Sequence, residues 1–217
     1  MCESPIIFTP QFAQSLRVMK TFKLNVRFAI GLSLAIFFGF APNSASAYET
    51  YVQLVARLSK SGAANHLFQP SIEAQLFTLA NSYRQNHGLP ALMADTTMLP
   101  AARAHAMDML QHHMMSHTAS TGQDFDSRMK ALRGGAMVLP PMGENAVMWK
   151  SKHLPTEGLA QKLFQSWVNS ADHRHTLLSR DYLKVSTGVA TNGTEIYADQ
   201  IFTGPEVTTN MLRLPQQ

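Results

Sequence analysis

KVSTGVATNGTEIYADQIF, residues 184–202, is the stretch that decides the predicted fold. Two β-prone runs, 184–190 and 195–202, flank the polar segment TNGT at 191–194. An Asn-Gly pair between such runs is typical of a β-hairpin, because both residues accept the positive φ angles of a tight turn. We therefore expect an antiparallel hairpin late in the chain.

Segments with the apolar periodicity of helices precede this hairpin. The first of these predicted helices is expected to end at Gly88 and Pro90, and the last is expected to be capped by Thr156. Helices that come first and a hairpin that comes late predict an α+β fold. Apolar residues at helical spacing place helices at about 72–87, 97–112, 124–132 and 156–167.

The chain between the last two of these helices is expected to be irregular. Residues 137–142 are predicted to be extended, and Pro140-Pro141 excludes them from a central strand. Gly143-Glu144-Asn145 is then interpreted as a loop, in which the Asn145 side chain would bond the local backbone and fix the direction of Glu144.

Residues 1–47 have the pattern of a secretory signal peptide. A basic flank precedes the apolar run 28–40, and an A-x-A cleavage site follows at 45–47. The run is too short to span a bilayer comfortably. We expect translation to start at Met19 and the mature chain to begin at Tyr48, without a stable membrane span and exported to the periplasm or the medium.

The predicted leader carries much of the positive charge. The whole chain has 18 basic and 14 acidic residues, of which the leader holds four and one, leaving 14 and 13 in the mature chain and a net charge of +1. This balance gives no reason to expect a nucleic-acid partner. The only cysteine, Cys2, lies in the leader, so the mature protein is expected to fold without disulfides.

The mature chain is long enough for one domain with a full core. Residues 48–70 are interpreted as a short helix and a linker. The domain is expected to cover 71–205, and residues 206–217 to form a C-terminal tail.

Three polar residues that lie far apart in the sequence form the candidate site: His117, Glu144 and His173. Two imidazoles and a carboxylate are the usual material of a metal or acid–base site, and a divalent metal such as zinc would suit them. Asn145 and Arg174 stand beside them and are expected to line the same polar cleft. Only a tertiary fold can bring the three together.

Other interpretations stay open. The same trio could form a hydrogen-bonded cleft without a metal, or Glu144 could cap backbone amides beside ordinary surface histidines. His105 is interpreted as a packing histidine, and His113 with His117 as a frayed helix end, because the glutamate of a His-Glu-x-x-His motif is absent. No serine has a nucleophile elbow or a supported base, so no catalytic residue is predicted.

The order of several short motifs resembles the CAP superfamily of cysteine-rich secretory, antigen 5 and pathogenesis-related proteins. It is more narrowly similar to the bacterial, cysteine-free SCP-like branch, over about residues 71–204. The motifs are Asn81-Ser82-Tyr83-Arg84, Ala101-Ala102-Arg103-Ala104-His105-Ala106, Ser116-His117-Thr118, Asp126-Ser127-Arg128, Gly143-Glu144-Asn145, Trp167-Val168-Asn169-Ser170 with His173-Arg174, and Tyr197 through Phe202.

The resemblance implies a three-layer α-β-α sandwich with a small antiparallel sheet and a polar cleft lined by histidines and glutamates. His117 and Glu144 match the first two cavity residues of the family, and His173 matches the histidine of the bacterial motif. The second glutamate of the animal and plant pattern is absent after Trp167, where this chain has Val168-Asn169-Ser170.

The leading hypothesis is an exported, non-enzymatic CAP/SCP-like protein whose cleft binds a small ligand, a lipid or a cell-envelope component. The first alternative is a metal-assisted hydrolase of peptide or cell-wall material, with Glu144 as base and His117 and His173 as ligands. The second is a structural or interaction domain.

Overall fold

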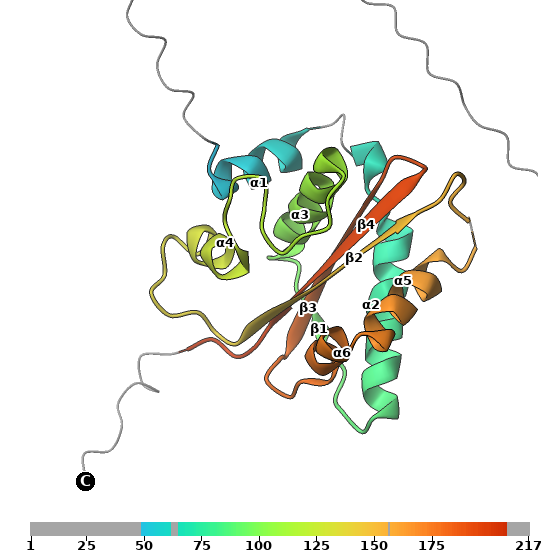
Figure 1. Cartoon of the computed structure of the whole chain (residues 1–217). Helices are drawn as coiled ribbons and strands as arrows, with labels where there is room; N and C mark the ends of the chain where they lie inside the picture. Colours follow the sequence, from blue (N-terminus) through green and yellow to red (C-terminus); the bar gives the residue numbers. More distant parts are fainter. Residues whose placement is uncertain (1–48, 62–64, 156, 208–217) are drawn as a thin grey trace, which may run out of the picture. The chain divides into compact units, whose positions relative to one another are not determined.

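The computed structural model describes residues 49–61, 65–155 and 157–207 (Figure 1). The predicted leader, the Thr156 cap and most of the predicted tail lie outside these residues. The elements are α1 (Tyr51–Lys60), the 3-10 helix η1 (Asn65–Leu67), α2 (Pro70–Asn86), β1 (Met93–Ala94), α3 (Leu99–His112), α4 (Phe125–Leu132), β2 (Met142–Lys150), α5 (Leu159–Asn169), α6 (Ala171–Leu178), β3 (Lys184–Thr191) and β4 (Glu195–Thr203).

The predicted hairpin is present as β3 and β4. These strands pair antiparallel from Lys184 opposite Thr203 to Thr191 opposite Ile196. Gly193 has a φ of +92°, which a glycine adopts without steric cost. Asn192 is not among the described residues with positive φ. It contributes instead through its side-chain oxygen, which accepts from the backbone N–H groups of Thr194 and Glu195.

The sheet has four strands in the order β1-β3-β4-β2. β1 pairs parallel to β3, whereas β2 pairs antiparallel to β4 over nine residues. The prediction that Gly143-Glu144-Asn145 forms a loop is therefore wrong, because all three residues lie in β2. Glycine, glutamate and asparagine are poor strand formers, and here long-range pairing with β4 overrides that local preference.

Helices cover both faces of this sheet in three layers, with α1, α3 and α4 on one face and α2, α5 and α6 on the other (Figure 1). We call these the α3 face and the α2 face. Alternation along β4 sends Tyr197 and Ile201 into the core of the α3 face, whereas Ala198 and Phe202 enter the core of the α2 face. Trp167 of α5 is fully buried in the core of the α2 face, as the sequence predicts.

A close backbone contact holds α3 against the sheet. An added Cβ on Gly188 of β3 would lie 2.3 Å from the backbone of Ala102 and Arg103 in α3. Only glycine allows this approach, and the small Ala102 and Ala106 on the same helix are fully buried. This packing fixes the position of α3, and the loop that carries His117 begins at the end of this helix.

Helix α1 belongs to the same packed body. Thr50 and Gln53 form a capping box at its start, and Tyr51, Leu54 and Leu58 are buried in the core of the α3 face. The described body therefore includes a helix that the sequence analysis placed before the domain. Among the described residues, none of the helices combines the length and apolar character needed to cross a bilayer.

Helix α6 was not among the helices predicted from the sequence. Ser170 ends α5 and also begins α6, so the chain turns there without a connecting segment. Only Leu177 of α6 is buried, and the helix has no apolar stripe that periodicity could reveal. Gly158 occupies the N-cap position of α5, with no side-chain cap.

Candidate functional site

The structure brings His117, Glu144 and His173 together. His117 lies in the loop after α3, Glu144 in β2 and His173 in α6. The Nδ1 atom of His117 is 2.6 Å from Oε2 of Glu144, and the two imidazole rings have centroids 6.4 Å apart. The His117 side chain is 55% exposed and that of Glu144 only 2%, so the site has a buried carboxylate beneath an imidazole that reaches solvent.

Strand register explains why Glu144 points inward. Glu144 pairs with Ile201 in β4, and both side chains enter the α3 face. There Nη2 of the buried Arg128 donates to Oε1 of Glu144 at 2.6 Å. Burial pushes the pKa of Glu144 up, but the hydrogen bond from His117 and the charge of Arg128 outweigh it and hold that pKa below its ordinary value. Glu144 is thus an ionised carboxylate with both oxygens occupied.

The two histidines differ in charge. The hydrogen bond to Glu144 raises the pKa of His117, which favours an imidazolium whose Nδ1 donates to the carboxylate. Burial, followed by the charge of His117, lowers the pKa of His173. The pair therefore presents one cationic donor and one neutral imidazole side by side.

Asn145 does not bond its own backbone as predicted. It is a buried strand residue on the α2 face, and its Nδ2 donates to the carbonyl of His173 at 3.1 Å. This bond ties α6 to β2 and fixes the height of His173 above the sheet. Arg174 of α6 points back toward α5, where its Nη1 donates to the carbonyl of Val168 at 2.7 Å.

Side chains of α3 hold the loop that carries His117. The Nε2 atom of His105 is 2.8 Å from the carbonyl of Ser116, and because a carbonyl only accepts, this nitrogen carries the proton. Asp108 accepts from the backbone N–H and the hydroxyl of Ser120 at 2.8 and 2.5 Å. Helix α3 itself ends at His112, and His113 adopts a left-handed conformation, so the predicted helix end is present there.

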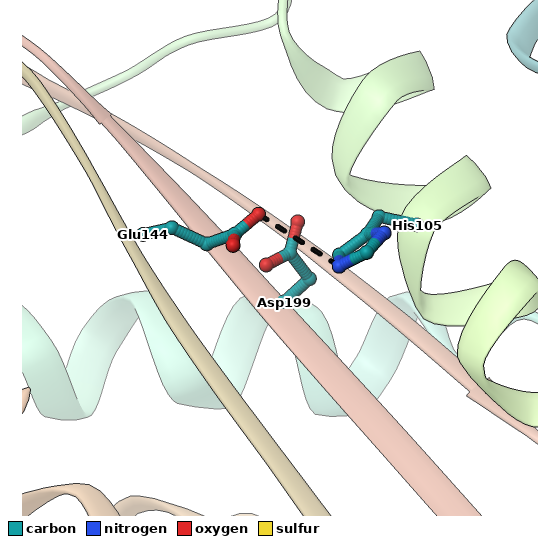
Figure 2. A group of neighbouring side chains, drawn as sticks. All are labelled: His105, Glu144 and Asp199. Carbon is teal, nitrogen blue, oxygen red and sulfur yellow. Dashed lines mark ion pairs between the residues drawn. The ribbon is translucent and has the colours of Figure 1, made fainter. Parts of the chain in front are cut away.

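A second buried group lies behind the site (Figure 2). His105, Glu144 and Asp199 each offer an atom within 4.8 Å of the others, and Nε2 of His105 is 3.9 Å from Oε1 of Glu144. Burial and the Arg128 charge lower the pKa of His105 to about 4. Burial and the Glu144 charge raise the pKa of Asp199 well above its ordinary value, and among the described residues its carboxyl has no hydrogen-bond partner. These shifts favour a neutral imidazole at His105 and the protonated form of the Asp199 carboxyl.

Arg128 and Asp199 belong to this site but were not predicted to do so. Both lie within family motifs quoted from the sequence, and neither was a candidate site residue. One signal was present for Asp199, because alternation along the predicted strand 195–202 places it on the same face as Tyr197 and Ile201. No local signal marks Arg128, since its partners are distant in sequence.

The donor set decides how a metal would fit. Both oxygens of Glu144 already contact cationic groups, so three-ligand binding by His117, Glu144 and His173 would displace one of these contacts. The observed bond from Nδ1 of His117 to a carboxylate is instead the arrangement that orients a metal-binding imidazole from behind. The residues thus fit two imidazole ligands with Glu144 as their orienting partner.

A hollow of about 360 Å³ among the described residues lies away from these histidines. It is lined by residues of α2, α3 and β3, including Phe77, Leu99 and Thr187. It opens at the β1–β3 side of the sheet, whereas Glu144 lies on β2 at the other edge. The candidate site is therefore defined by contacts between side chains.

Comparison with known proteins identifies the family. The family model of CAP, the cysteine-rich secretory protein family, matches residues 77–204, which is more than half of the chain. The chain belongs to this family. It is 28% identical to YkwD of Bacillus subtilis over 122 residues, which are 56% of this chain and 43% of that protein.

Solved structures share the fold. An extracellular protein with an SCP domain from Bacillus anthracis is similar with a TM-score of 0.50 and 25% identity, over 63% of this chain and 41% of that one. An outer surface protein of Borrelia burgdorferi matches with a TM-score of 0.50 and 16% identity, over 62% of this chain and 94% of that one. The chain spans less than half the length of both Bacillus relatives.

Proposed function

We propose that this chain is an exported, non-enzymatic CAP domain whose His117–His173 site binds a phosphate-bearing envelope component. The observation that carries the proposal is the exposed, positively charged imidazole of His117, held over the buried Glu144–Arg128 pair. Export is supported by the signal-peptide pattern and by similarity to an extracellular protein and an outer surface protein.

Charge balance supports an anionic ligand. Arg128 and the imidazolium form of His117, which Glu144 favours, carry two positive charges against the one negative charge of Glu144, and burial favours the protonated form of the neighbouring Asp199. The group thus has an excess positive charge, and no described residue bonds Nε2 of the exposed His117, so this nitrogen is able to donate to an anionic oxygen. A neutral His173 beside it supplies a second hydrogen-bonding group.

The geometry disfavours Glu144 as a general base. A base needs a lone pair directed at substrate and a pKa close to the working pH. The carboxylate of Glu144 has Arg128 on one oxygen and His117 on the other, and its pKa is lowered. Binding is therefore better supported than hydrolysis.

Co-sedimentation with vesicles tests this proposal. The full chain should be retained by phosphatidylglycerol vesicles more than by phosphatidylcholine vesicles, and His117→Gln and His173→Gln should each reduce retention. His87→Gln is the matched control, because His87 lies at the end of α2, where its Nδ1 is 2.8 Å from the Tyr83 carbonyl and its ring packs on that of Tyr83. Equal retention of all four proteins, or of none, would contradict the proposal.

A competition arm separates a lipid headgroup from a soluble phosphate ligand. If inorganic phosphate at millimolar concentration releases the protein from the vesicles, the site recognises phosphate itself. If only glycerol phosphate releases it, the headgroup is recognised as a whole.

Zinc binding is the second candidate, favoured by the carboxylate that orients His117 and by the neighbouring ring of His173. The two imidazoles would hold the ion, which when bound would supply a Lewis acid. Glu144 favours the imidazolium form of His117, and a metal would have to displace the Nε2 proton of that imidazolium. The affinity for zinc should therefore rise with pH. Calorimetry with zinc at pH 6 and pH 8 tests this, and unchanged binding in His117→Gln and His173→Gln would exclude the assignment.

A further inference from the structure

Arg128 contacts both halves of the candidate site from behind. Its Nη2 donates to Oε1 of Glu144 at 2.6 Å and to the backbone carbonyl of His117 at 3.0 Å. Glu144 belongs to β2 and His117 to the loop after α3, so a single nitrogen joins two elements that are 27 residues apart in sequence. Arg128 is fully buried and cannot touch a ligand.

Two aromatic rings hold the guanidinium in place. The Cζ atom of Arg128 lies 5.2 Å from the ring centroid of Tyr51 and 5.5 Å from that of Phe125. Nη1 also donates to the Tyr51 hydroxyl at 3.3 Å, and that hydroxyl in turn donates to the carbonyl of Ala101 at the same distance. The ion pair, the hydrogen bonds and the two aromatic rings thus together hold the Arg128 guanidinium in one orientation.

We propose that Arg128 is a positioning residue that sets the distance and direction of His117 relative to Glu144, and that helix α1 is part of this device through Tyr51. The family match begins at residue 77, so α1 lies outside it. This inference rests on the proposed function only in assigning a ligand to the site. The positioning itself is a property of the protein without ligand.

Arginine is required by the geometry. Only a guanidinium can direct Nη2 at Glu144 and His117 while Nη1 reaches Tyr51 and Cζ lies over two aromatic rings. A lysine would retain the charge beside Glu144 but would lose the stacking and the bond to Tyr51. Methionine would fill similar space, but it would leave Glu144 with His117 as its only cationic partner.

Nitrogen-15 NMR of the histidine side chains in the full chain gives a readout that is independent of ligand. At a fixed pH of 7, the ring nitrogens of His117, assigned with His117→Gln, should report a strong bond to a carboxylate. Arg128→Met should move these signals toward those of a solvated imidazole through loss of positioning, whereas loss of the Arg128 charge alone would raise the pKa of His117 and favour the imidazolium. Arg128→Lys should give an intermediate position, and Tyr51→Phe a smaller shift in the same direction.

Vesicle retention of the same proteins supplies the second readout. Arg128→Met should weaken apparent affinity for phosphatidylglycerol vesicles by about tenfold, the usual effect of losing a residue that orients a site from behind. Arg128→Lys should recover part of the loss. If the parent binds no vesicles while the NMR shifts follow the expected order, the proposed ligand is wrong and the positioning role stands.

Matched controls exclude a general loss of structure. Arg103→Met removes an arginine of α3 whose bidentate partner is Glu73, away from the site. Tyr197→Phe removes a buried hydroxyl that has no partner among the described residues. The positioning role is overturned if either control moves the His117 signals as far as Arg128→Met does, or if Arg128→Lys and Tyr51→Phe, both folded, leave those signals in place.

Discussion

The strands of the sheet bury different kinds of polar side chain on its two faces. On the α3 face, Glu144 and Asp199 meet His105 and Arg128, so ionisable groups gather in the core. On the α2 face the corresponding residues are neutral: Asn145 bonds the His173 carbonyl, and Gln200 bonds the hydroxyl of Thr187 at 3.2 Å. Buried charge is costly unless it is paired, whereas a buried amide needs only hydrogen bonds. The ionisable side chains that the strands bury therefore gather on the α3 face, beside His117 of the candidate site.

Gly188→Ala should cause the largest loss of stability, because it disrupts the packing of α3 on the sheet. The new Cβ would lie 2.3 Å from the backbone of Ala102 and Arg103, and a backbone contact cannot relax by a rotamer change. We expect a loss of about 3 kcal/mol or more in the free energy of unfolding, measured by urea denaturation.

Gly143→Ala is the matched substitution on the other face. Its Cβ would meet mainly the end of the Tyr182 side chain, which is able to swing away. A loss as large as that of Gly188→Ala would show that the close approach of α3 is not special.

His105 should make the α3 face sensitive to acid. Its folded pKa of about 4 lies below the ordinary 6.5, so the unfolded chain binds its proton first as the pH falls. The parent should therefore lose on the order of 3 kcal/mol relative to His105→Gln between pH 6.5 and pH 4. Parallel stability curves for the two proteins across that range would refute the neutral, buried assignment.

Asp199→Asn should stabilise the α3 face, in contrast to the acid-induced loss of stability expected from His105. The raised pKa of Asp199 means that its stabilisation is present below the ordinary value of 3.8 and is lost as the pH rises toward the folded pKa. An asparagine amide at this position would donate to Glu144 without titrating. We expect the variant to be about 1–2 kcal/mol more stable than the parent at pH 7, by urea denaturation. A less stable variant would mean that Asp199 is ionised.

Gln200→Met should have the smallest effect, because the α2 face holds no charge at this position. The substitution removes one hydrogen bond to Thr187 and also a side-chain oxygen that has no partner among the described residues. The two changes oppose each other, so the free energy of unfolding should stay within about 1 kcal/mol of the parent. Thermal unfolding followed by circular dichroism is sufficient to measure it.

The sequence predicts the parts of this fold that have local signals. The Asn-Gly hairpin, the helix with Trp167 and the convergence of His117, Glu144 and His173 all appear in the structure. β2 was missed because Gly143-Glu144-Asn145, near its start, has low strand propensity. The polar side chains of Glu144 and Asn145 serve contacts with residues that are distant in sequence. Helix α6 was missed because it has no apolar stripe.

The candidate site shows the same limit. His117 and His173 were predicted as site residues, but the roles of Arg128, Tyr51 and Asp199 were not. These three act through contacts that span 11 to 77 residues or through burial alone. Such contacts leave no periodic pattern, and only the fold reveals them.

An NMR titration of the histidine ring nitrogens tests the central claim most directly. We predict that His117 titrates above 6.5 and His173 below it, and that Glu144→Gln returns His117 toward 6.5. If both histidines titrate together at 6.5 in the parent, and Glu144→Gln changes neither, the charged group on the α3 face does not control the site.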